Sequence, residues 1–211
     1  MFADLSVREF LSKVGSVEPV PGGGSVAALA LGLAASLTRM VALLTKGRKD
    51  DAALDAKMAR LIETSSHLEA RLLSAVDEDS AAYTRVMDAY RLPKGTDDEK
   101  RIRQGAVQDA LKGAALVPLS VAEMGVELLM LAEVAVKEGN RNAATDGLVG
   151  ALMARSGVLG ALFNVRINLA AITDDAFCAD LSAKISLLER EAIDKEADII
   201  AFTARMMEKE A

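Results

Sequence analysis

The chain has 211 residues, of which 51% are hydrophobic and only 3% aromatic, so Ala, Leu, Val and Met must fill its core. A formal net charge of −6 argues against a nucleic-acid-binding surface. Because Cys178 and His67 are the single Cys and His, an internal disulfide and zinc sites built from several Cys and His are excluded. If the protein is an enzyme, we expect its acid or base to be Asp, Glu, Lys or Tyr.

The first helix is predicted just after Ser6, which forms a capping-box pattern with Glu9. A loop follows, and residues 26–44 then form an apolar run that is too long for a strand and predicts a buried helix. This run contains Arg39 and is largely Ala and Gly, so we expect soluble core and no membrane span. The N-terminal segment has no leader pattern, and the expected location is therefore cytoplasmic.

The loop Pro19-Val20-Pro21-Gly22-Gly23-Gly24-Ser25 leads into this buried helix, with Gly24 or Ser25 expected near the N-cap. Glycines without Cβ atoms allow a ligand to approach the backbone. The helix start adds free N–H groups and the positive end of the dipole, which suit an oxyanion or a carbonyl oxygen. The alternative is a tight turn before a core helix.

A cationic segment, with Lys46, Arg48 and Lys49, follows the buried helix. It is either an ordinary helix C-terminus with favourable cations or a patch that binds carboxylates. Residues 52–90 then predict one long amphipathic helix. Within it Asp79 and Tyr83 are four residues apart on a partly apolar face, so the Asp79 carboxylate is a candidate for burial.

Helices are again predicted after the capping box Thr96/Glu99, and Pro118 either begins a new helix or kinks a continuing one. A turn with two amides, Asn140 and Asn142, precedes Asp146 and a helix rich in Gly and Ala. Asn164 and Asn168, four residues apart, point the same way. Their amides are costly to bury without partners and must bond to each other, to backbone or to a ligand.

The last helix is predicted from its cap at Asp174, with an apolar stripe that is core or an oligomer seam. No segment has the alternation of a strand. The fold predicted for residues 1–211 is therefore one all-α domain, a bundle of long helices with small-residue packing faces, expected to be dimeric.

These motifs together resemble the formiminotetrahydrofolate cyclodeaminase and methenyltetrahydrofolate cyclohydrolase family, in order along nearly the whole chain. The residues that carry the resemblance are Pro21 to Ala28, Leu44-Thr45 with Gly47-Arg48-Lys49, Asp79 with Ala82-Tyr83, Leu92-Pro93-Lys94, Val117-Pro118-Leu119, Gly139-Asn140 with Asn142, Asp146, and Asn164-Val165 through Asn168-Leu169. Two departures stand out: Thr145-Asp146-Gly147 replaces the family's usual Ser-Asp-Ala, and Asp50-Asp51 stand where an aromatic residue usually follows the Gly-Lys-Lys run.

The resemblance implies an all-helical dimer with its site near the subunit interface and a one-carbon folate as substrate. In cyclodeamination N10 of the folate attacks the formimino carbon and ammonia leaves, and no metal or redox cofactor is required. A carboxylate near that carbon favours the cation and relays protons. Asp146 is our first choice for it and Asp79 the second; the alternatives are an N-cap and a surface helix acid.

Binding roles follow from the same comparison. The Gly22, Gly23, Gly24 and Ser25 loop is expected to meet the ligand with backbone N–H groups. The four amides, Asn140, Asn142, Asn164 and Asn168, are expected to bind the pterin edge or orient the acids. The cations Lys46, Arg48 and Lys49 are the candidates to hold the glutamate tail, which is polyglutamylated in some folates.

Three hypotheses of different kinds stay open. The first is an ammonia-lyase or, on the same site, a hydrolase that opens methenyltetrahydrofolate. The second is a catalytically silent folate-binding or scaffold protein, and the third is a structural helical dimer whose polar motifs are caps and packing devices.

Overall fold

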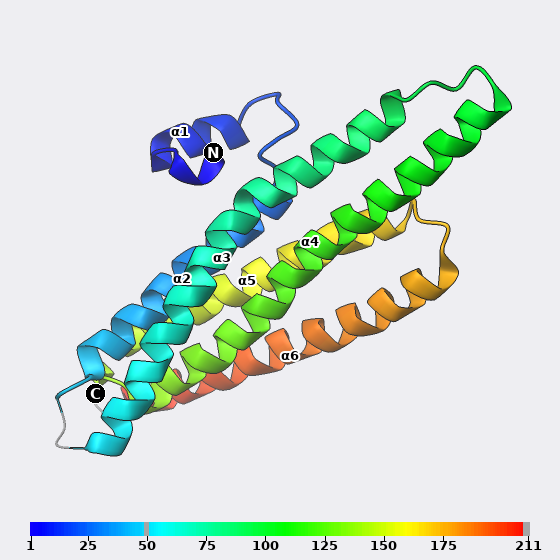
Figure 1. The fold of residues 1–211 in the computed structure, drawn as a ribbon. Coiled ribbons are helices and arrows are strands. Elements are labelled where there is room, and N and C mark those ends of the chain that lie inside the picture. The colour runs from blue at the N-terminus through cyan, green and yellow to red at the C-terminus, as the bar shows by residue number, and fades with distance from the viewer. Residues whose placement is uncertain (49–50, 209–211) are drawn as a thin grey trace.

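The fold is a bundle of long helices, seen in a computed structural model that describes residues 1–48 and 51–208 (Figure 1). The described ranges hold helices and no strand, which confirms the predicted all-helical class. The α-helices are α1 (Val7–Val14), α2 (Gly23–Thr45), α3 (Ala52–Arg91), α4 (Asp97–Glu138), α5 (Ala144–Leu169) and α6 (Asp175–Glu208), with short 3-10 turns η1 (Phe2–Asp4) and η2 (Arg141–Ala143).

Local signals account for most helix ends. Both predicted capping boxes are present, Ser6 with Glu9 on α1 and Thr96 with Glu99 on α4. The predicted cap of the last helix is also confirmed, because the Asp174 carboxylate accepts a hydrogen bond from the backbone N–H of Phe177 at 3.0 Å.

The start of α2 and the course of α4 past Pro118 refine the predictions. The helix α2 begins at Gly23 with Gly22 as its N-cap, so Gly24 and Ser25 lie near the N-cap, as expected, but neither of them caps the helix. The physical reason is that the Ser25 hydroxyl is fully buried against α3 and is therefore not free to cap. Pro118 lies inside α4, which continues through it as one helix.

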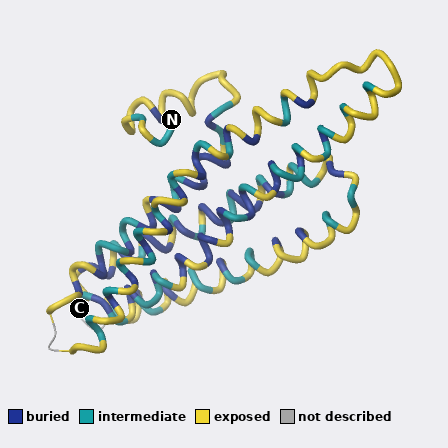
Figure 2. Tube along the Cα trace, in the orientation of Figure 1, coloured by how far each residue is buried: buried dark blue, intermediate teal, exposed yellow. Residues whose placement is uncertain are grey.

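The helices α2 and α5 run antiparallel and approach closely because their facing residues are small. A Cβ on Gly157 would lie 2.6 Å from the Leu31 side chain, and one on Gly150 would lie 3.3 Å from Leu37 Cβ. Buried residues line the inner sides of these helices (Figure 2). The small-residue faces expected from the sequence thus set the spacing of the core.

An apolar face stays uncovered on the outer side of the same two helices. On α2 it includes Val26, Leu33 and Leu44, and on α5 it includes Phe163 and Ile167, which are 61% and 71% exposed. Three helical segments, Gly23–Thr45, Asp97–Glu138 and Arg141–Leu169, are also long and apolar enough to cross a membrane, judged by length and composition only. The expectation of no membrane span stays a prediction.

Candidate functional site

A cavity of about 430 Å³ gathers many of the predicted site residues at one end of the bundle. Its walls come from the loop before α2, the first turn of α2, the second half of α3, one residue of α4 and the last turns of α5. The lining residues are Pro19, Val20, Gly22, Gly23, Gly24, Asp79, Ala82, Tyr83, Val86, Met87, Tyr90, Ala114, Asn164, Ile167 and Asn168.

Asp79 supplies the acid of this cavity. Its carboxylate Oδ2 accepts a hydrogen bond from the buried Ser25 hydroxyl at 3.0 Å, and that hydroxyl also lies 2.9 Å from the Val76 carbonyl oxygen. Burial raises the pKa of Asp79 above its ordinary value of 3.8, and the bonds from Ser25 offset part of that rise. The carboxyl is therefore held closer to neutrality than a surface acid, which suits a group that both accepts and returns a proton.

The first turn of α2 presses against this carboxylate. A Cβ on Gly24 would overlap the Asp79 carboxyl group, so any larger residue there would force that side chain to move. Gly23 is exposed to the cavity and is the first helical residue, where the backbone N–H has no partner within the helix. The predicted glycine loop is thus the start of α2, and it lies against the Asp79 carboxylate.

Two amides face the cavity from α5, and both are held by backbone carbonyls. The Asn164 side-chain nitrogen donates to the carbonyl of Gly160 at 2.9 Å, and that of Asn168 donates to the carbonyls of Asn164 at 2.8 Å and Ala114 at 3.2 Å. Neither side-chain oxygen accepts a hydrogen bond from another described residue. The cavity therefore offers two fixed acceptors to a ligand rich in N–H groups.

The contact between Asn168 and Ala114 depends on Pro118. A residue inside a helix normally donates its N–H to the carbonyl four residues earlier, and proline has no N–H to give. Ala114 is that residue for Pro118, so its carbonyl is left for the Asn168 amide. The proline of α4 thereby helps to fix a side chain of α5.

Several lining residues were not among the predicted site residues. Tyr90 follows Tyr83 by two helical turns and so lies on the same face of α3. This spacing alone could have identified Tyr90 as a site residue. Ile167 and Met87 gave no such signal, since apolar side chains on helices are ordinarily core. They join the cavity only because α3 and α5 pack beside the glycine loop.

The other predicted residues lie at the far end of the bundle. The helix α2, with 23 residues, separates the two ends by roughly 34 Å. Lys46 and Arg48 are exposed beyond its C-terminus, and Asp146 is the third residue of α5, where Ala143 and not Asp146 is the N-cap. Lys49 lies outside the described residues.

Asn140 and Asn142 belong to this far group. The Asn140 backbone N–H donates to Thr45 Oγ1 at 2.8 Å, its side-chain nitrogen donates to the Leu44 carbonyl at 3.3 Å, and its Oδ1 accepts from the N–H of Asn142 at 3.1 Å. These bonds give Asn140 a structural role, since it ties the end of α2 to the turn before α5. One protomer therefore does not bring Asp146 and Asp79 together.

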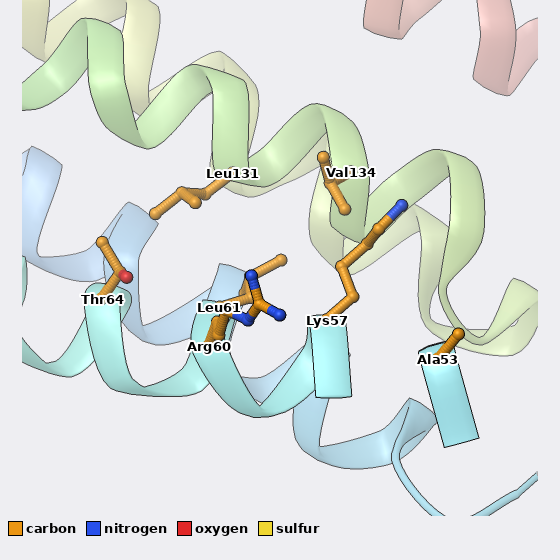
Figure 3. A pocket seen from close by; sticks show the side chains of 7 residues that line it. All are labelled: Ala53, Lys57, Arg60, Leu61, Thr64, Leu131 and Val134. Carbon is orange, nitrogen blue, oxygen red and sulfur yellow. The ribbon is translucent and has the colours of Figure 1, made fainter. Parts of the chain in front are cut away.

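A second cavity of about 280 Å³ lies between α3 and α4 (Figure 3). Its floor is formed by Leu61, Leu131 and Val134, and Lys57 and Arg60 lie at its edge. Lys57 is already paired with Glu138 at 2.6 Å. None of the predicted site residues lines this cavity, and it holds no carboxylate or amide among its lining residues.

The larger cavity of this helical bundle holds one semi-buried carboxylate, an arrangement suited to acid–base chemistry on a small molecule. Within the described ranges, no group of three or more His, Cys, Asp or Glu is placed to hold a metal ion. The family model described as formiminotransferase-cyclodeaminase matches residues 6–187. The chain belongs to this formiminotransferase-cyclodeaminase family.

Individual relatives agree with this assignment. The chain is 40% identical over 194 residues to the formimidoyltransferase-cyclodeaminase of Sus scrofa, an alignment that covers 92% of this chain and 36% of that protein. It thus spans about a third of the length of such relatives. It is also 35% identical over 192 residues to the methenyltetrahydrofolate cyclohydrolase of Methylorubrum extorquens, covering 91% of this chain and 92% of that protein.

A solved structure is similar over the whole chain. The crystal structure of formiminotetrahydrofolate cyclodeaminase from Thermotoga maritima matches with a TM-score of 0.89 and 27% sequence identity, covering 98% of this chain and 100% of that one.

Proposed function

We propose that the protein is a one-carbon folate enzyme that converts 5-formiminotetrahydrofolate to 5,10-methenyltetrahydrofolate and ammonia. The observation that carries the proposal is the Asp79 carboxyl, raised in pKa by burial and set in a cavity between a free helix start and two amide acceptors. The names of the family and of its relatives support the substrate class.

The chemistry assigned to each group follows from its position. The folate N10 attacks the formimino carbon, and Asp79 accepts the proton that N10 loses. The same carboxyl returns this proton to the amino group, which leaves as ammonia while the N5–C–N10 methenyl cation forms. Substrate and product are both cations, so an ionised carboxylate beside the carbon stabilises them in a partly dry site.

The remaining polar groups suit the pterin. Its ring and exocyclic N–H groups find acceptors at the side-chain oxygens of Asn164 and Asn168, and its carbonyl oxygen finds the N–H of Gly23. No step of this mechanism calls for a metal or redox cofactor.

A second function, hydrolysis of 5,10-methenyltetrahydrofolate to 10-formyltetrahydrofolate, is favoured by one observation. The methenyltetrahydrofolate cyclohydrolase of Methylorubrum extorquens aligns over 92% of its own length, so it is a protein of about the same size as this chain. In this reaction Asp79 accepts a proton from the water that attacks the methenyl carbon. It returns this proton to N5 as the bond between that carbon and N5 breaks, and the remaining hydroxyl proton goes to solvent while the formyl group stays on N10.

We also propose that the protein is a homodimer packed through the apolar face of α2 and α5. If a twofold axis passes through the middle of that face, perpendicular to the helices, each helix runs antiparallel to its counterpart in the other copy. The Asp146 end of one protomer then lies beside the Asp79 cavity of its partner, which unites the two groups of predicted residues in one site. The exposed Phe163 and Ile167 would be covered in the same assembly.

The decisive assay follows the near-ultraviolet band of methenyltetrahydrofolate. Its growth from 5-formiminotetrahydrofolate with release of ammonia supports cyclodeamination, and its decay without ammonia supports the hydrolase. Folate binding with neither change would establish the silent folate-binding hypothesis instead.

A further inference from the structure

The Asp79 cavity has a basic neighbour at the open end of the α3–α4 hairpin. A hollow of about 390 Å³ is lined by Lys94, Lys100, Arg103, Gln104, Val107 and Gln108. Arg103 connects the two hollows, because its Nε donates to the carbonyl of Tyr90 at 3.1 Å and its guanidinium lies 5.5 Å from the centre of the Tyr90 ring. Tyr90 itself lines the Asp79 cavity.

Most cations at this end of the α3–α4 hairpin are already paired with carboxylates. Lys100 pairs with Asp97 at 2.8 Å, Arg101 with Asp98 at 3.0 Å, and Arg91 with Asp88 at 2.9 Å. In the part of the chain that the structure describes, Lys94 and Arg103 have no carboxylate partner. The Glu99 carboxylate, which is close in sequence, is occupied by the backbone N–H groups of Gly95 and Thr96.

The order of groups along α3 matches the order of groups in a folate. Asp79, Tyr83 and Tyr90 follow one face of the helix over roughly 16 Å, and Lys94 comes three residues after the helix ends at Arg91. A reduced folate carries, in the same order, the one-carbon unit between N5 and N10, the aminobenzoyl ring and the glutamate carboxylates. The acid, the aromatic rings and the cations therefore follow one another in an order that would suit a folate lying along α3.

From this juxtaposition we propose that Lys94 and Arg103 bind the glutamate tail of the substrate. The inference rests on the proposed function. It assigns the tail to the same protomer that supplies Asp79, in contrast to the expectation that Lys46, Arg48 and Lys49 hold it. A fork-shaped guanidinium and a mobile ammonium suit successive carboxylates of a polyglutamate.

The test compares monoglutamate and triglutamate forms of 5-formiminotetrahydrofolate on the full chain. Lys94 is exposed, so Lys94→Ala and Lys94→Glu should fold normally. We expect Lys94→Glu to raise KM for the triglutamate about three- to tenfold, the scale of a lost and reversed exposed ion pair, with a smaller rise for the monoglutamate. The difference should shrink at high salt.

The matched control is Arg101→Ala, which removes a cation from the same tip outside the hollow and should leave both KM values unchanged. Equal KM changes for both substrates in the Lys94 variants would overturn the proposal. So would a Lys46→Ala/Arg48→Ala variant that selectively raises KM for the triglutamate while the Lys94 variants do not. A wild-type protein without turnover of any one-carbon folate would instead contradict the proposed function itself.

Discussion

Asp79 is subject to opposing influences that together set its pKa. Burial disfavours the ionised form, whereas the Ser25 hydroxyl and the positive end of α2 favour it. Since burial is the largest cause, the pKa lies above 3.8. Gly24 makes this environment possible, because any larger residue there would push the carboxylate away.

This shift has a definite consequence for stability. The folded protein keeps the Asp79 proton to a higher pH than the unfolded chain, so stability falls as pH rises from about 3.8 through the folded pKa. Asp79→Asn removes the charge. We expect the urea midpoint of the variant to rise relative to that of the wild type as pH increases over this range, and the difference to stay constant at higher pH. Midpoints measured from pH 4 to pH 8 check this. A wild type that gains on the variant as pH rises would mean that Ser25 and the helix end outweigh burial.

Single residues were predictable where spacing carried the signal. The four-residue separations of Asp79 and Tyr83, and of Asn164 and Asn168, placed each pair on one helix face, and all four line the cavity. The basic tip was missed because Lys94 and Arg103 belong to different elements, and only the packing of the α3–α4 hairpin brings them together.

At the scale of elements, α4 and α5 are coupled through a missing hydrogen bond. Pro118 leaves the carbonyl of Ala114 free, and Asn168 uses it. The sequence showed the proline and left two alternatives for it, a new helix or a kink. Its role toward Asn168 depends on how α4 and α5 pack, which no local pattern specifies.

Replacing the proline tests this coupling. In Pro118→Ala the new N–H competes with Asn168 for the Ala114 carbonyl, so we expect KM for the folate to rise several-fold while the melting temperature is unchanged or higher. The stability gain is limited to a fraction of the roughly 3 kcal/mol that separates Pro from Ala in helices, because a buried proline is also lost. Asn168→Ala should raise KM similarly, and the double variant should add little. Additive effects would show that the two residues act separately.

At the scale of the whole molecule, the length of α2 places the predicted site residues in two groups, one at each end of the bundle. Composition and periodicity predicted the helical class, and the family resemblance implied an interfacial site in a dimer. Periodicity does not state which helix ends meet, so Asp146 and Asp79 were grouped in the sequence although α2 keeps them apart within one protomer. The uncovered apolar face on α2 and α5 offers the surface that would reunite them.

Mixed dimers test that arrangement. If Asp79 and the partner's Asp146 share one site, Asp79→Asn and Asp146→Asn homodimers are both impaired. A co-expressed mixture then recovers about a quarter of wild-type turnover, since half of the dimers carry one intact site of two. Wild-type chains mixed with the Asp79→Asn/Asp146→Asn double variant serve as the reference. A stable monomer in sedimentation at micromolar concentration, or an Asp146→Asn protein with near-normal turnover, would contradict the shared site.

The most direct measurement is the turnover of 5-formiminotetrahydrofolate by Asp79→Asn. Asparagine keeps the shape and the acceptor oxygen for Ser25 but neither carries the charge nor relays a proton. We predict that turnover falls by at least about 10², the lower end of what general acid–base catalysis contributes, while the protein stays folded and still binds the folate. A folded Asp79→Asn protein with near-normal turnover would contradict the account.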